Sequence, residues 1–491
     1  MRPIPIYSPE DMRHADYILI PVIKKDNKKL VKYLAACEGS FSSAWLKQAL
    51  HLAENHQPDY RKFIEQWVGK QKLIFMGLGE EKIYQKMAGV CRWAVHKHVE
   101  KQAGAKIVLV LPDYLDGNTI SALANGLHLS TLRLDYYKSE KTGQPEALAF
   151  FPGKKSALGS IEAGIQLAAS QEEICHLVNM PPNEINPQYI AGWARREFHG
   201  RPVKVEVLEE EALAQQKMGA LLAVGMGSNT PPRLLVLDYH PPVKGKKLRH
   251  IGLVGKGVTF DTGGISLKEP SNMHLMKSDM GGAAAVLGAV DLVEKYGLPV
   301  RLTAVIPLAE NAIGPASYRP GDVIHSYSGK SIEIIDTDAE GRLILADALA
   351  YLLKKFKPEI MVDLATLTGS CIMTLGNKAA GLFTNNDRLA EGLTTAGEAT
   401  GERVWRLPLW KEFEEEMHSD IADIKNLATK PVAGATTAAK FLEAFTSSHP
   451  AWAHLDIAGV AMVDSDYSKM RSASAYGVHL LVKWIEDLIK K

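Results

Sequence analysis

The sequence predicts two α/β domains, of which the C-terminal one is larger and is built on a mixed, mainly parallel central sheet flanked by helices. Three observations predict this fold class. The chain has 491 residues, which is more than one hydrophobic core usually serves. Its short β-branched runs alternate with longer helical patterns, as βαβ units do. Its content of 46% hydrophobic and 23% charged residues is ordinary for a globular protein.

The first domain is expected to span residues 1–155. Short apolar runs predict its strands at 17–22, 72–79, 105–112 and 148–152. Longer runs between them predict helices at 81–102 and 119–138. The sequence GKKS at 153–156 interrupts this alternation and marks the end of the domain.

Residues 156–180 are expected to link the two domains. The stretch 156–178 is amphipathic and predicts a long helix. The sequence NMPPNEINP at 179–187 ends it, because proline cannot continue a helix.

The C-terminal domain, residues 181–491, resumes the alternation. Its strands are predicted at 203–208, 221–225, 233–239, 249–260, 300–307, 323–327, 331–335, 359–364, 380–384 and 452–457. Its helices are predicted at 190–199, 209–217, 281–296, 343–356 and 476–490.

Composition excludes several classes of function. The net charge of +1 gives no general reason to expect a nucleic acid or an acidic partner. The four cysteines form no CxxC pair, so a thiolate zinc site is not expected and a reduced, cytoplasmic setting is. We expect no signal peptide at residues 1–22 and no transmembrane helix, since the chain has no sufficiently long apolar run.

The stretch of most chemical interest is DTDAEGRL at 336–343. Asp338 and Glu340 are two residues apart, so on an extended backbone they point to the same side and need a cation between them. A solvated acidic turn is the alternative interpretation. Upstream, VGKGVTFDTGG places Lys256 and Asp261 where a strand gives way to a glycine-rich loop.

Two further charged residues follow that loop, and each has an ordinary interpretation of its own. Asp279 precedes the Gly-Gly pair that opens the predicted helix 281–296, where it could serve as an N-cap. Lys268 taken alone would be a surface lysine. Taken with Asp261, Asp338 and Glu340, however, Asp279 makes a fourth carboxylate at the strand ends and loops of an α/β region, where such sheets bind ligands.

Four carboxylates would balance two divalent cations, and a two-metal hydrolytic site uses such hard oxygen ligands. Lysine is an unusual metal ligand, because it must lose its proton. Other site types are not supported: the glycine–lysine pairs do not fit a Walker loop, and neither HExxH nor GxSxG occurs.

These motifs resemble the cytosolic leucyl aminopeptidases, the hexameric two-metal family that includes bacterial aminopeptidase A. The family signature is NTDAEGRL, and further resembling blocks occur in the same order over roughly residues 170–491. They are VGKGVTFDTGG, SLK, SDMGGAAA, ATLTG at 365–369, ADIKN at 422–426 and AHLDIAG at 453–459. The resemblance implies a homohexameric exopeptidase that acts on peptides with an apolar, leucine-like first residue.

The resemblance also implies roles for individual residues. Two divalent ions, Zn or Mn with Mg or Co as further options, would be bound by Lys256, Asp261, Asp279, Asp338 and Glu340, with Asp261 and Glu340 bridging. A metal-bridging hydroxide would attack the carbonyl that Lys268 polarises, and Arg342 would hold a bicarbonate as general base. Met276, Thr366 and Gly369 would line the pocket for the first side chain, and Leu367 would contact the substrate backbone.

One position departs from the family pattern, and two other functions compete. Asp336 stands where the family usually has asparagine, which would add a fifth carboxylate near the site. One competing function is a narrower dipeptidase, for example one acting on Cys-Gly. The other is DNA binding, for which the chain offers only scattered basic clusters at 24–29 and 154–155.

Overall fold

The computed structural model describes residues 4–5, 12, 14–37, 42–55, 58–100, 103–243, 248–464 and 470–490. The chain divides into two compact units. Unit 1 comprises Met1–Glu172, Ala399–Gly401 and Asp464–Met470; unit 2 comprises Glu173–Glu398, Glu402–Val463 and Arg471–Lys491. Both units are α/β, which confirms the predicted fold class.

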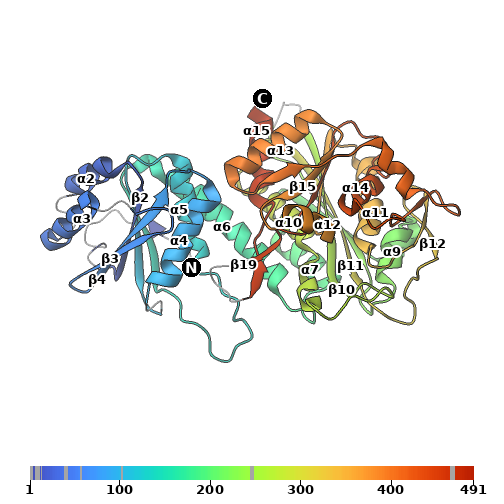
Figure 1. Ribbon diagram of the computed structural model, residues 1–491, viewed down its shortest axis with the longest axis horizontal. Coiled ribbons are helices and arrows are strands. Elements are labelled where there is room, and N and C mark those ends of the chain that lie inside the picture. Colours follow the sequence, from blue (N-terminus) through green and yellow to red (C-terminus); the bar gives the residue numbers. More distant parts are fainter. Residues whose placement is uncertain are drawn as a thin grey trace. The chain divides into compact units, whose positions relative to one another are not determined.

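Unit 1 is built on a six-stranded sheet in the order β1-β6-β5-β2-β4-β3, which is parallel except for the β3–β4 pair (Figure 1). Its elements are β1 (Ile4–Pro5), β2 (Tyr17–Ile23), α2 (Asn27–Ala36), α3 (Ser43–Asn55), β3 (Phe63–Val68), β4 (Gln71–Gly79), α4 (Tyr84–His98), β5 (Lys106–Leu111), α5 (Gly117–Leu129), β6 (Ala147–Pro152) and η1 (Lys155–Ala157). Helix α6 (Leu158–Asn179) follows and contributes residues to both units.

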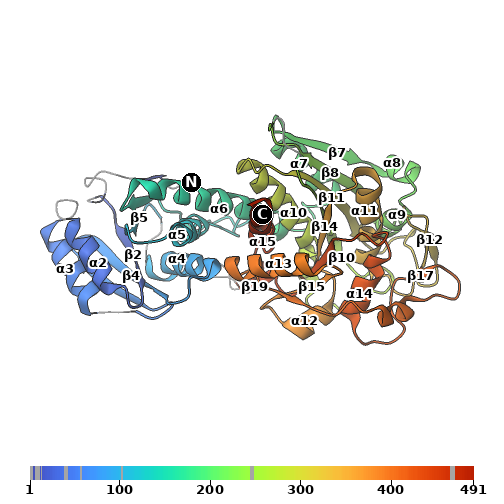
Figure 2. The same ribbon diagram turned by 90° about the horizontal axis from the view of Figure 1, so that it is seen from above.

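The two faces of this sheet bury alternate residues of the same strand. Ile18 and Ile20 of β2 pack with α2 and α3, whereas Tyr17 and Leu19 pack with α4 and α5. Figure 2 shows these two helix layers on either side of the sheet. The strand period of two therefore distributes the apolar residues into two cores.

Unit 2 contains a nine-stranded sheet in the order β16-β15-β18-β14-β9-β11-β8-β7, with β10 paired to β11. Its strands are β7 (Val203–Leu208), β8 (Arg233–Tyr239), β9 (His250–Gly255), β10 (Gly257–Asp261), β11 (Arg301–Asn311), β14 (Ile360–Ala365), β15 (Ala380–Thr384), β16 (Val404–Arg406) and β18 (Trp452–Asp456). Two small sheets use β12 (Val323–His325), β13 (Ser331–Glu333), β17 (Ile424–Lys425), β19 (Met462–Asp464) and β20 (Arg471–Ala473).

The helical elements of unit 2 are α7 (Pro187–Glu197), α8 (Glu210–Gln215), α9 (Gly219–Gly225), η2 (Met273–Ser278), α10 (Gly281–Lys295), α11 (Glu340–Phe356), α12 (Gly369–Leu375), α13 (Asp387–Thr400), η3 (Lys411–Met417), α14 (Gly434–Glu443) and α15 (Val478–Lys490). Helices α10 and α11 cover opposite faces of β9. A Cβ atom at Gly252 would meet Leu352 of α11, whereas one at Gly255 would meet Ala283 of α10.

The centre of the large sheet is parallel: β18, β14, β9, β11 and β10 run in one direction. Parallel neighbours end at the same edge, and open α/β sheets bind ligands beyond that edge. Lys256, Asp261, Asn311, Thr366 and Asp456 lie at or just past these strand ends.

Three sequence predictions differ from the structure. Residues 221–225 were predicted as a strand but belong to helix α9, because a short apolar run has no diagnostic period and this one packs on α11. Helix α5 ends at Leu129 rather than 138, where the hydroxyls of Ser130 and Thr131 bond to the carbonyls of Leu127 and His128.

The third difference concerns 249–260, which forms two strands, β9 and β10, separated at Lys256. Several elements were not predicted, among them the helices α2, α3, α12, α13 and α14 and the strands β1, β3, β16, β17, β19 and β20. Most of residues 1–13, on which the signal-peptide interpretation partly rests, and residues 101–102 at the end of a predicted helix, lie outside the described residues. None of the described helices is both long and apolar enough to cross a membrane.

Candidate metal centre

Lys256 occupies the break between β9 and β10 and turns its side chain into the protein. Its Nζ lies 2.8 Å from Asp279 Oδ1 and 2.8 Å from Glu340 Oε1, and it donates to the carbonyl oxygen of Thr366 at 2.8 Å. Only 2% of the residue is exposed. All three acceptors lie near the carboxyl edge of the sheet, so this lysine connects the elements that meet there.

Two glycines allow these elements to approach so closely. A Cβ atom at Gly282, in the first turn of α10, would lie 2.1 Å from the carbonyl oxygen of Leu364. A Cβ atom at Gly341, in the first turn of α11, would lie 2.4 Å from Cε and 2.6 Å from Nζ of Lys256. Any other side chain at either position would displace backbone or the lysine itself.

Asp261 ends β10 and is held by neutral donors on one oxygen and by a lysine on the other. Its Oδ1 accepts the N–H of Gly263 at 2.9 Å and Nδ2 of Asn311 at 2.8 Å. Its Oδ2 lies 2.8 Å from Nζ of Lys268, which also pairs with Asp338. A single ammonium group thus joins the β10 loop to the turn before α11.

The turn that carries Asp338 is fixed from both sides. The Thr337 hydroxyl donates to the carbonyl of Gly263 at 2.6 Å, and Asp336 Oδ1 accepts the N–H of Asp338 at 2.9 Å. The buried amide of Asn426 accepts the N–H of Ile335 at 2.7 Å and donates to the carbonyl of Asp336 at 2.6 Å. Glu340 then opens α11, where the helix dipole favours a carboxylate.

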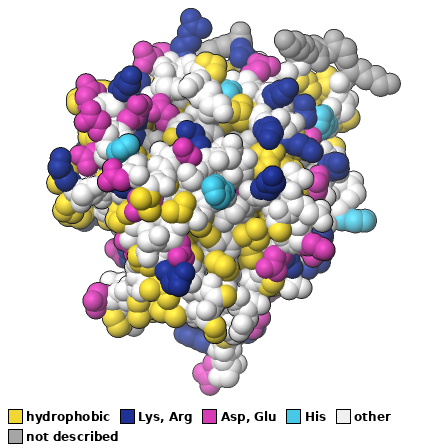
Figure 3. Space-filling view, turned by 90° about the vertical axis from the view of Figure 1, so that its right-hand side faces the viewer, with side chains coloured by type: hydrophobic (Ala, Val, Ile, Leu, Met, Phe, Trp, Pro, Cys, Tyr) yellow, Lys and Arg dark blue, Asp and Glu magenta, His cyan; other side chains and the backbone are white. Residues whose placement is uncertain are grey.

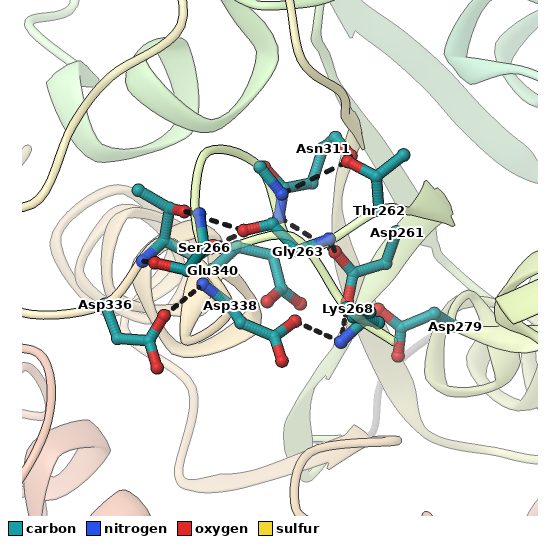
Figure 4. Close-up of polar contacts among 12 residues, drawn as sticks. Asp261, Thr262, Gly263, Ser266, Lys268, Asp279, Asn311, Asp336, Asp338 and Glu340 are labelled. Atoms are coloured by element: carbon teal, nitrogen blue, oxygen red, sulfur yellow. Dashed lines mark hydrogen bonds and ion pairs between the residues drawn. The ribbon is translucent and has the colours of Figure 1, made fainter. Parts of the chain in front are cut away.

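Figure 4 shows the carboxylates of Asp261, Asp279, Asp338 and Glu340 gathered around Lys268. Ligand oxygens of Asp261, Asp338 and Glu340 lie within 4.8 Å of one another. Each of the two lysines bridges two carboxylates, Lys256 between Asp279 and Glu340 and Lys268 between Asp261 and Asp338. The structure therefore brings together six of the seven charged residues that the sequence indicated, namely the four carboxylates and the two lysines.

The donor set fits divalent cations. Asp279 Oδ2 is buried and has no hydrogen-bond partner among the described residues, which is costly for an ionised oxygen unless a cation meets it. The remaining carboxylates offer hard oxygen atoms at short mutual spacing, the ligands that such ions prefer.

The pKa values show how strongly these charges depend on one another. Burial opposes the charge of Lys256, but Asp279, Glu340 and Asp261 outweigh it and raise the lysine pKa. Burial, followed by the charge of Asp261, raises the pKa of Asp338 to about 7. Burial also raises the pKa of Asp279 well above its usual range. The cluster is thus an acidic site in which negative charge is poorly solvated.

Arg342 lies two residues past Glu340 in the first turn of α11 and is buried. Its Nη1 donates to the carbonyl of Asn426 at 2.8 Å, while its Nε has no partner among the described residues. Burial lowers its pKa to about 10. A fixed cation with donor capacity to spare therefore adjoins the carboxylate cluster.

Two of the residues indicated for substrate contact, Thr366 and Met276, lie next to Asp279. The Thr366 hydroxyl donates to Asp279 Oδ1 at 2.7 Å. Met276 is half-buried in η2, directly before Asp279, and Gly369 is exposed at the start of α12. The N–H of Leu367 donates to Asp456 Oδ1 at 3.2 Å, so this donor already has a partner within the protein.

Sequence reasoning assigned no role to three residues that shape the centre: Asn311, Asn426 and Asp456. Asn426 and Asp456 lie in the blocks ADIKN and AHLDIAG, where a polar residue ends a short strand. A polar residue at the end of a short strand was therefore the signal from which Asn426 and Asp456 could have been found. Asp456 also accepts the Thr368 hydroxyl at 2.6 Å and so holds the loop that leads into α12.

The acidic centre contains two buried or half-buried lysines and lies at the carboxyl edge of a mainly parallel sheet. Such a fold and site define an α/β protein of the metal-dependent hydrolase class. The chain belongs to the cytosol aminopeptidase family, because residues 174–482 match the catalytic domain of that family. It is therefore a metal-dependent aminopeptidase, a protease whose substrates are peptides.

Relatives extend the match beyond the catalytic domain. A probable cytosol aminopeptidase of Chlorobaculum parvum is 38% identical over 490 residues, which cover 95% of this chain and 94% of that protein. One from Chlorobium limicola is 44% identical over 384 residues, covering 76% and 75% of the two chains.

Solved structures agree with these sequence relatives. The bottromycin maturation enzyme BotP in complex with Mn has a TM-score of 0.82 at 29% identity, covering 96% of this chain and 99% of that one. The cytosol aminopeptidase of Coxiella burnetii has a TM-score of 0.79 at 28% identity, covering 96% and 97%.

Proposed function

We propose that this aminopeptidase removes apolar, leucine-like first residues from peptides with the help of two divalent cations. The observation that carries the proposal is the convergence of four carboxylates and two lysines at one sheet edge. We further propose Zn or Mn as the native metals, with Mg or Co as further options. BotP, a structural neighbour, binds Mn.

Five residues would hold the metals. Lys256 and Asp279 would serve one ion and Asp338 the other. Asp261 and Glu340 would serve both: Glu340 pairs with Lys256 and also belongs to the group of close carboxylates that contains Asp338. Lys256 would bind only after losing its proton, which neighbouring divalent charge favours.

The metal pair, when bound, makes a water molecule acidic enough to attack and polarises the scissile carbonyl. Lys268, whose side chain is 22% exposed, would donate to the oxyanion that develops on the peptide carbonyl. Arg342 would hold a bicarbonate, which would accept the proton of the attacking water as general base. The unpartnered Nε of this buried guanidinium supports an anion at that position.

We assign the first side chain to a pocket formed by Met276, Thr366 and Gly369, next to Asp279, and the free amino terminus to one of the two metals. Leu367 would contact the substrate backbone, through its carbonyl since its N–H already bonds to Asp456. A requirement for a free amino terminus would account for exopeptidase action.

We propose a cytoplasmic homohexamer, as the family resemblance implies. Exposed apolar side chains support contacts between subunits, since large exposed residues include Met373, at 90% exposure, and both Trp405 and Trp410. Figure 3 shows apolar side chains gathered in patches between charged ones on one face of unit 2.

DNA binding gains no support from the basic clusters. Lys24 pairs with Asp59, Lys25 with Glu80 and Lys29 with Asp26. The Nζ of Lys154 donates to the carbonyl oxygen of Asp113 at 2.6 Å. The three lysines paired with carboxylates are locally neutralised, so the cluster at 24–29 does not make the basic stripe that phosphate binding requires.

The decisive experiment measures hydrolysis of Leu-amide by metal-stripped protein after adding Zn, Mn, Co or Mg separately. We expect activity to return with at least one ion, and Leu-Gly-Gly but not N-acetyl-Leu-Gly-Gly to be cleaved. Glu340→Gln should abolish turnover, whereas Glu402→Gln, which alters an equally buried carboxylate of unit 2, should retain it.

Three outcomes would contradict the proposal. Near-normal turnover by the Glu340 variant would remove the two-metal assignment. Cleavage of Cys-Gly without cleavage of Leu-amide would establish the narrower dipeptidase. Cleavage of the acetylated peptide would exclude a role for the free amino terminus.

A further inference from the structure

Asp336 is the acidic residue of the DTDAEGRL turn that takes no part in the lysine pairs. Its Oδ1 accepts the N–H of Asp338 at 2.9 Å, and its carbonyl accepts Nδ2 of Asn426 at 2.6 Å. The side chain therefore has a fixed direction. In Figure 4 its carboxylate lies beside that of Asp338, on the side away from Asp279.

Asp336 differs from its acidic neighbours in having no lysine within ion-pair distance among the described residues, although the buried charge of Arg342 acts on it over a longer range. Asp261, Asp279, Asp338 and Glu340 each meet a lysine within ion-pair distance. Within the described part of the chain, no basic side chain forms an ion pair with Asp336. Bound metals would neutralise the four inner carboxylates and leave Asp336 as a negative charge at the rim.

Figure 4 shows Asp336 on the side of the site away from Asp279, and Asp279 contacts Thr366 of the proposed pocket for the first side chain. Thr366 bonds to Asp279, which pairs with Lys256. At the other end, Asp336 bonds to Asp338, which pairs with Lys268. A peptide whose first side chain lies by Thr366 and whose scissile carbonyl meets Lys268 extends its remaining residues toward Asp336.

We infer that Asp336 is a specificity-determining residue that favours peptides with a cationic side chain directly after the first residue and disfavours acidic ones. The inference rests on the proposed function for the direction of the bound peptide. A half-exposed carboxylate attracts an ammonium or guanidinium group and repels a carboxylate on the departing part of the substrate. Surface ion pairs of this kind change affinity modestly, by about twofold to fivefold.

The test compares three dipeptide amides of similar side-chain length, Leu-Lys-amide, Leu-Gln-amide and Leu-Glu-amide. For the metal-loaded native protein we expect kcat/KM to fall in that order. The values for Leu-Lys-amide and Leu-Glu-amide should differ about tenfold, since attraction and repulsion add. The span should shrink at high salt, because a half-exposed charge is screened.

The variant Asp336→Asn keeps an oxygen for the Asp338 N–H but removes the charge. We therefore expect its Lys/Glu ratio, the kcat/KM for Leu-Lys-amide divided by that for Leu-Glu-amide, to fall close to one. The matched control is Glu359→Gln, which deletes one exposed negative charge before the amino end of β14, at the opposite sheet edge, and should keep the ratio. Binding of the corresponding reduced-amide analogues, measured by calorimetry, provides a readout that does not depend on turnover.

The outcomes separate this inference from the proposed function. Equal kcat/KM for the three amides in the native protein, or an unchanged ratio in Asp336→Asn, overturns the role of Asp336 while leaving the aminopeptidase intact. If the variant does not fold, the salt dependence of the native protein decides. A Lys/Glu ratio that stays the same at high salt overturns the role of Asp336 as well. Failure to cleave any of the three amides with any metal overturns the proposed function instead.

Discussion

Gly341 lies against the side chain of Lys256, so closely that a Cβ atom at Gly341 would be 2.4 Å from the lysine Cε. The lysine reaches Asp279 and Glu340 only because the first turn of α11 has no side chain at this point. This single relationship connects the strand break at the carboxyl edge of the sheet to the helix that carries Glu340.

Gly341→Ala should therefore disable the centre. The added methyl must displace Lys256 or the start of α11, and a displacement of about 1 Å at a reacting centre costs on the order of 100-fold in rate. The measurement is kcat/KM on Leu-amide. Gly159→Ala is the control, because a Cβ atom there meets nothing within 4 Å and the substitution should leave activity unchanged.

Asn426→Ala should weaken metal binding without removing a ligand. Its amide holds the backbone of Ile335 and Asp336, and thereby the direction of Asp338. Losing a group that orients a metal ligand typically costs about 10- to 100-fold in affinity. Calorimetric titration with Mn²⁺ measures this. Asn186→Ala removes an amide that caps α7 and should leave the affinity near that of the native protein.

Metal loading should stabilise the native protein and fail to stabilise a variant without the shared carboxylate. An ion at about 100 times its Kd contributes about 2.7 kcal/mol to stability, which corresponds to a rise in Tm of roughly 3–4 °C for a unit or chain of this size. Differential scanning calorimetry of the chelator-treated protein with and without MnCl2 tests this. An equal rise in Glu340→Gln would show that the ion binds elsewhere, whereas Glu402→Gln should behave like the native protein.

Stability should fall as pH rises toward neutral because of Asp347. This α11 carboxylate accepts the N–H groups of Leu221 and Tyr327 at 2.9 and 2.7 Å, yet burial raises its pKa to about 7. The folded state therefore holds this proton more tightly than the unfolded state, whose pKa lies near 3.8. The resulting stability is fully present below about pH 4 and is lost as pH passes 7.

The measurement is the free energy of unfolding in urea between pH 4.5 and 7.5. Across this range the native protein should lose roughly 3 kcal/mol relative to Asp347→Asn, which cannot ionise at this position. Asp387→Asn, an exposed carboxylate at the start of α13, is the control and should track the native protein. Parallel pH curves for native protein and Asp347→Asn would contradict the assignment.

The sequence by itself determined the residue types of the centre and the fold class. Lys256, Asp261, Asp338 and Glu340 stand in glycine-rich or acidic motifs whose chemistry is local, so their spacing already indicates ligands at strand ends. Where a local signal is ambiguous, prediction was wrong. The apolar run 221–225 is equally suited to strand or helix, and only its packing on α11 decides for helix α9.

Only the tertiary structure decided how these motifs meet. The lysine pairs bring together residues 70 positions apart, as in Lys268 and Asp338, and Asn426 fixes a turn from 90 positions away. Such contacts depend on parallel strands that end at one edge and on glycines that let helices approach it. The tertiary structure also distinguishes Asp336 from the other carboxylates of its motif. Its side chain bonds to the N–H of Asp338 and lies on the side of the site away from Asp279.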